Sequence, residues 1–140
     1  MTDWTQHHPT TQLTAPDGRT VAIDVEMVPL VTELWRLGFA TKVACQDAGE
    51  ATREGGTRTP QAERQRVAAR LMGRAWLVIR AEEAKHLLDV WAELAEPEVF
   101  LLRPTKNDSE PADWVSLTFP RELIAATTQE LRSIASLRLD

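Results

Sequence analysis

The sequence predicts an α+β domain of the ferredoxin-like class, a βαβ–βαβ sandwich with an inserted arginine-rich helix and an extra C-terminal helix. Three observations support this class. The chain has 140 residues, which suits one domain with a single core. Segments with the period-two alternation of strands take turns along the chain with segments of helical periodicity. The composition, 43% hydrophobic and 26% charged, is that of a globular chain and excludes disordered, collagen-like and membrane-spanning classes.

The first elements follow from turn residues and apolar spacing. Residues 1–18 have little apolar periodicity and end in an Asp-Gly turn, so they are predicted to be an irregular N-terminal arm. Residues 19–26 alternate between apolar and polar side chains, which predicts a half-buried strand. Apolar residues at three- and four-residue spacing, with a proline in the first turn and a glycine after the last, predict a helix over 28–37.

The middle of the chain holds the insertion. A short strand is predicted over 41–45, and the glycine-bearing segment 47–58 after it is predicted to be irregular. Thr59-Pro60 has the form of an N-cap and a first helical residue, so the next dozen residues are predicted to be a helix. The continuous apolar run over 75–79 is the best candidate for a central strand.

The last elements complete the sandwich. A helix with one apolar side is predicted over 81–95, and Pro97 closes it. Residues 98–102 and 113–119 form two strand patterns that are neighbours along the chain, so they are expected to pair as a hairpin. Pro120 begins a final amphipathic helix.

These patterns predict a single α+β domain over 19–140, with 47–73 as a loop and helix insertion and 1–18 as the arm. The start of the chain has no secretory pattern and no apolar run approaches the ~18 residues that a bilayer needs, so we expect a cytoplasmic protein that does not enter membranes. The single cysteine, Cys45, excludes an internal disulfide framework and a cysteine-rich zinc site. No cofactor and no metal site are predicted.

The face of the predicted sheet turned away from the helices is the first candidate for function. Its side chains would mix large aromatic rings with polar and charged groups: Asp24, Glu26, Lys42, Gln46, Trp76, Val78, Arg80, Trp114, Ser116 and Thr118. Such a mixture suits contact with a partner. We therefore predict a small binding or interaction domain that self-associates through this face, with Trp76 and Trp114 in the interface of a homodimer or of a complex with another protein.

A second interpretation is a small enzyme or ligand-binding protein. Its pocket would be lined by Cys45, Gln46 and Asp47, where a strand ends and a glycine-bearing loop begins, together with Glu26. A Cys45 thiolate would be nucleophilic if a base or a cation lowered its pKa. The favoured alternative for Cys45 is a small buried apolar residue, because it is in phase with Val43 and no activating partner is evident.

A third interpretation is an anion or nucleic-acid binder. Residues 50–74 hold six Arg against three Glu, a net charge of +3, and the candidates are Arg58, Arg64, Arg66 and Arg70. Arg64 projects close to the apolar stripe of its helix and must either extend to solvent or meet an anion. A solvated helix is the favoured alternative. The tryptophans could also stack bases, but the net charge of −5 repels a polyanion, so nucleic acid is the less favoured partner.

Part of the chain resembles a group of small uncharacterised actinobacterial and actinophage proteins, which share a "P-L-(I/V)…L-W…G…T…S-C-Q" segment followed by a strand and a helix. The matching stretches are 28–47 and 75–94. This sequence departs from the pattern at Ala44, where the group has Ser, and at Asp47, where Gly is common. The resemblance implies an origin and no activity. The residues of its short motif are Pro29, Leu30, Val31, Leu34, Trp35, Gly38, Thr41, Cys45 and Gln46.

Overall fold

The structure is a computed structural model that describes residues 9–53, 59–104 and 114–134. The described residues form an α+β fold with two antiparallel sheets. The smaller sheet pairs β1 (Thr10–Thr14) with β2 (Thr20–Asp24). The larger sheet has the order β3-β4-β6-β5, made of β3 (Thr41–Cys45), β4 (Arg74–Arg80), β6 (Trp114–Pro120) and β5 (Leu101–Pro104).

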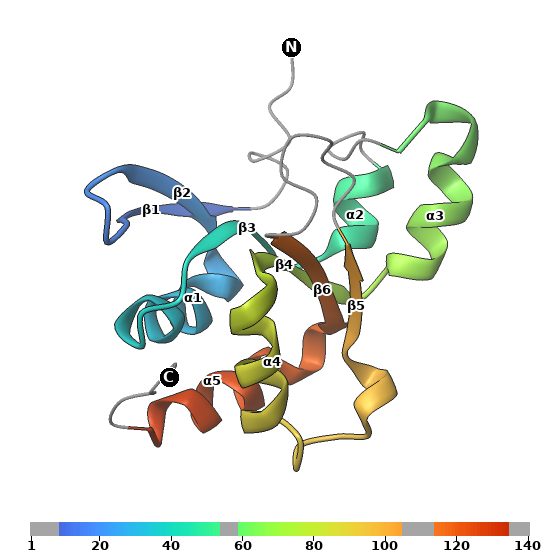
Figure 1. Ribbon diagram of the computed structural model, residues 1–140. Helices are drawn as coiled ribbons and strands as arrows, with labels where there is room; N and C mark the ends of the chain where they lie inside the picture. The colour runs from blue at the N-terminus through green and yellow to red at the C-terminus, as the bar shows by residue number, and fades with distance from the viewer. Residues whose placement is uncertain (1–8, 54–58, 105–113, 135–140) are drawn as a thin grey trace.

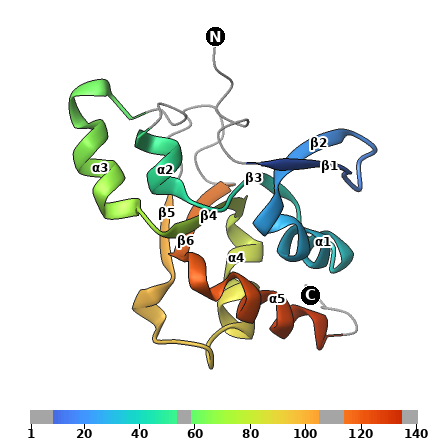
Figure 2. The ribbon, with the colours of Figure 1, turned by 180° about the vertical axis from the view of Figure 1, so that it is seen from behind.

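Five α-helices accompany the sheets: α1 (Val28–Arg36), α2 (Ala48–Arg53), α3 (Arg64–Leu71), α4 (Ala81–Val90) and α5 (Ile124–Arg132). Helices α1, α4 and α5 lie on one side of the larger sheet, while α2 and α3 pack on each other on its other side (Figures 1 and 2). None of these helices is long and apolar enough to cross a membrane. The α+β class is confirmed. The face of the larger sheet that is turned away from α1, α4 and α5 is partly covered by the α2–α3 pair.

The finer ferredoxin-like arrangement differs from the prediction. Strands β4 and β5 both pair antiparallel with β6, so they run parallel to each other, and α4 joins them as one βαβ crossover with β6 between the two strands. The predicted strand over 19–26 was expected in the same sheet. Instead, β2 pairs with β1 in the smaller sheet, because residues 10–14, expected to be irregular, occupy its edge.

The sequence signal for β1 is weak, since Leu13 is the only apolar residue in the strand and four of its five side chains are exposed. The chain reverses through Gly18, which has a φ of 91°, and the Ala15 N–H donates to the Arg19 carbonyl oxygen at 2.8 Å. After Asp24 the chain turns into a 3₁₀ segment, Val25–Met27, which ends the strand two residues early. Val25, which belongs to the segment predicted to be a half-buried strand, is 46% exposed as a result.

The register of the larger sheet separates two faces. Ala75, Leu77 and Ile79 lie opposite Phe119, Leu117 and Val115, and all except Val115 are fully buried in the core beneath α1, α4 and α5. By alternation, Trp76 and Trp114 lie on the opposite face, which we call the tryptophan face. The predicted placement of the two indole rings, away from the main helical layer, is therefore confirmed.

The predicted phase of β3 is wrong. Cys45 lies opposite Trp76, and Ala44 lies opposite Leu77, so Cys45 and Val43 share the tryptophan face instead of the helix-facing one. The ladder between β3 and β4 shifts between Thr41 and Val43. Such an irregularity reverses the side-chain alternation that follows it, and the sequence carries no signal for it.

One helix and two helix boundaries also differ from the prediction. Helix α2 lies inside a segment expected to be irregular, α4 ends at Val90 instead of 95, and α5 begins after the 3₁₀ segment Arg121–Leu123. Beyond the end of α4, Trp91 is fully buried and forms a ring cluster with Phe100 and Phe119, with centroid separations of 5.6 and 5.8 Å. This cluster anchors the turn after α4 to the core.

Candidate functional site

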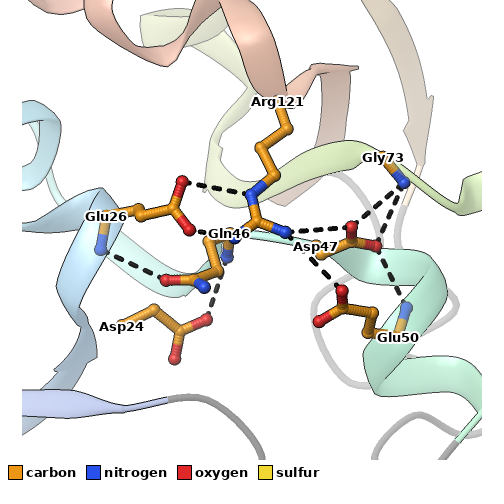
Figure 3. A network of polar contacts seen from close by, with 7 residues as sticks. All are labelled: Asp24, Glu26, Gln46, Asp47, Glu50, Gly73 and Arg121. Carbon is orange, nitrogen blue, oxygen red and sulfur yellow. Dashed lines mark hydrogen bonds and ion pairs between the residues drawn. The ribbon is translucent and has the colours of Figure 1, made fainter.

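A network of charged and polar groups joins three segments that are distant in sequence. Arg121, directly after β6, donates from Nε to Glu26 Oε1 at 3.1 Å, and its Nη2 contacts the other oxygen of the same carboxylate. Its Nη1 lies 3.3 Å from Asp47 Oδ2 and 3.6 Å from Glu50 Oε1 (Figure 3). The hydrogen bond with Glu26 raises the pKa of Arg121 above its usual range. One guanidinium thus holds the 3₁₀ segment after β2 and helix α2 against the end of β6.

Asp47 is buried, with 3% of the residue exposed. Its Oδ1 accepts a hydrogen bond from the Glu50 N–H at 3.0 Å, which is the N-cap interaction that begins α2. The Gly73 N–H donates to both oxygens of the same carboxylate, at 3.2 and 3.1 Å. Asp47 therefore ties the start of α2 to the start of β4, and its oxygens are used inside the protein.

Gln46 and Asp24 fasten the smaller sheet to the larger one. The Gln46 N–H donates to Asp24 Oδ2 at 2.9 Å, and the Glu26 N–H donates to Gln46 Oε1 at 3.2 Å (Figure 3). Both Gln46 and Asp24 are buried. Since β2 and β3 form no ladder with each other, these side-chain bonds replace backbone pairing between the two sheets.

Cys45 is 1% exposed and lies beneath this network. Burial raises the pKa of the Cys45 thiol to about 12, and the nearby carboxylates of Asp24 and Asp47 act in the same direction. The thiol therefore stays protonated at neutral pH, and the thiolate that a nucleophilic mechanism requires does not form. This agrees with the alternative that the sequence favoured, a small buried apolar residue.

The structure thus brings together three of the four residues of the predicted pocket, Glu26, Gln46 and Asp47, but binds them to one another and to Arg121. In the part of the chain that the structure describes, no group of three or more His, Cys, Asp or Glu side chains is arranged to hold a metal ion. The contacts among Asp24, Glu26, Gln46, Asp47, Glu50 and Arg121 fasten the smaller sheet and α2 to the larger sheet, and we call this set of residues the polar joint. Sequence reasoning missed Arg121 because the residue lies 95 positions from Glu26 and 74 from Asp47.

The face of the larger sheet that carries the two tryptophans has a different character. Lys42 Nζ and Arg80 Cζ each lie 4.9 Å from the centroid of the Trp114 ring, within the range of cation–π contacts. Trp76 donates from Nε1 to Ser116 Oγ at 2.6 Å, which fixes its ring on the face. Both tryptophans are half-buried, and Arg80 is exposed.

Every charged residue in the four strands of the larger sheet is basic: Lys42, Arg74, Arg80 and Arg103. Arg74 donates from Nη2 to the carbonyl oxygens of Val99 and Thr118, at 2.8 and 2.9 Å, which are uncharged acceptors. By register, Arg103 lies opposite Ser116 and Arg80 opposite Trp114, so both are on the tryptophan face. The tryptophan face thus includes Lys42, Arg74, Trp76, Val78, Arg80, Arg103, Trp114, Ser116 and Thr118.

The acidic residues expected on the tryptophan face lie elsewhere. Asp24 belongs to the smaller sheet, and Glu26 follows it in the 3₁₀ segment, where it pairs with Arg121. Gln46 lies one residue past β3. The physical reason for the error is that β2 is not part of the larger sheet, so Asp24 and the following Glu26 lie away from this face.

The predicted anion-binding arginines have separate environments. Arg66 pairs with Glu63 at 3.0 Å on the exposed side of α3, as expected for a solvated helix, and Arg70 is exposed. Arg64 is half-buried, and its Nε is a buried atom without a hydrogen-bond partner, in keeping with its predicted projection toward the apolar stripe. Arg58 lies outside the described residues.

No family model, no curated protein and no solved structure matches this chain. The resemblance to small actinobacterial and actinophage proteins therefore stays a prediction.

Proposed function

We propose that this chain is a small binding domain whose contact surface is the tryptophan face and whose partner is anionic. One observation carries the proposal: the four strands hold four cations and no carboxylate, within a chain whose formal net charge is −5. Since these strands contribute +4, the rest of the chain carries −9. Such local concentration of one sign of charge favours a ligand of the opposite sign.

Apolar surface beside the cations supports the same proposal. Leu101, opposite Thr118 on the tryptophan face, is 39% exposed, and the two indole rings are half-buried. Aromatic residues and arginine are enriched at binding surfaces because they combine large contact area with hydrogen bonding. An anionic partner that also offers flat or apolar surface would use both components.

A second copy of this chain is the other candidate occupant. A two-fold dimer places one patch against the same patch of its partner, so four cations would face four cations. Like charges at an interface are unfavourable, which is why the anionic partner is the stronger proposal. Self-association would instead take a head-to-tail form, with the tryptophan face against the acidic remainder of another copy.

Retention on immobilised heparin, a polyanion, tests the proposal. The wild type is compared with Arg80→Gln/Arg103→Gln, which removes two cations from the tryptophan face. The matched control is Lys85→Gln/Arg132→Gln, which removes two exposed cations from α4 and α5. We expect the face variant to elute at clearly lower salt than the wild type and the control.

Three outcomes contradict the proposal. If the wild type passes through the heparin column in low salt, the face does not bind anions. If the two variants elute together, the contact is non-specific. If instead Arg66→Gln/Arg70→Gln loses retention and the face variant does not, the contact lies on α3. Light scattering on the same samples measures the molar mass and so tests self-association. If the wild type is a dimer and the face variant is a monomer, the occupant of the tryptophan face is a second copy of the chain.

A further inference from the structure

We draw no further inference here: the strongest candidate, the half-buried side chain of Arg64 at the start of α3, has a buried Nε atom without a hydrogen-bond partner, but that atom is closed to solvent and so to an anion, and nothing in the described part of the chain shows a second ligand-binding group beside it.

Discussion

Removal of the Asp47 carboxylate should be among the most damaging changes to the polar joint. Asp47→Ala deletes the N-cap of α2, which is worth ~1 kcal/mol, and the hydrogen bond from the Gly73 N–H, which is worth ~0.5–1.5 kcal/mol. It also deletes the ion pair with Arg121, whose side chain is 30% exposed, so solvent screening limits that contribution to ~0.5–1 kcal/mol. The free energy of unfolding should therefore fall by about 2–3.5 kcal/mol.

Asp47→Asn is the matched control. Asparagine is as good an N-cap as aspartate, and its one oxygen accepts from the Glu50 N–H, so the loss is confined to the ion pair and one acceptor. We expect a decrease of about 1 kcal/mol for this variant. Urea unfolding followed by far-UV circular dichroism measures both, and the thermal midpoint of Asp47→Ala should fall by roughly 10 °C.

Two results would refute this reasoning. If Asp47→Ala lies within ~0.5 kcal/mol of the wild type, the network does not contribute to stability and its groups are available for another purpose. If Asp47→Asn is as damaging as Asp47→Ala, the stabilisation by Asp47 comes from its charge and not from the N-cap hydrogen bond.

Two further predictions concern ionisable groups. Because the pKa of Cys45 is about 12 and the residue is 1% exposed, iodoacetamide at pH 8.5 should leave the native thiol unmodified for hours and alkylate it in 8 M urea; rapid native alkylation would restore the nucleophilic interpretation. Glu83 is buried and accepts from the Ala40 N–H at 3.2 Å, and burial raises the pKa of its carboxyl. Between the ordinary pKa of glutamate and this raised value, the folded state binds more protons than the unfolded state, so stability falls as pH rises through that window. Glu83→Gln keeps the acceptor oxygen and removes the charge, so its unfolding free energy relative to the wild type should be higher at pH 7 than at pH 4; the reverse order would contradict the assignment.

The pattern of β4 shows what the sequence could predict. Its apolar run and alternation placed Leu77 in the core and Trp76 on the opposite face, because a central strand is determined by its own side chains. Strand β3 was predicted at the right residues with the wrong phase, since the irregularity between Thr41 and Val43 depends on pairing with β4. Strand β1 was missed because a strand with one apolar residue is held by backbone pairing, which leaves no mark in the sequence.

The polar joint was predicted only in part for a related reason. Gln46 and Asp47 stood out because they follow a strand and precede glycine, but Arg121 is one of many arginines until the fold brings it to Glu26. Contacts between residues so far apart depend on topology, and the topology was wrong where β2 leaves the larger sheet. The charge of the tryptophan face was predicted wrongly for the same reason, because Asp24 and Glu26 were expected on it.

The way the β1–β2 hairpin is attached has a consequence for local stability. The hairpin packs on the core through Leu13, Val21 and Ile23, and the Asp24–Gln46 bond and the Glu26–Arg121 pair also hold it, while no shared ladder joins the two sheets. Because no backbone ladder resists their separation, we expect amide protons of β1 and β2 to exchange with deuterium together and before those of β4 and β6. Arg121→Gln, which removes the pair with Glu26, should hasten this exchange while the central strands keep their protection.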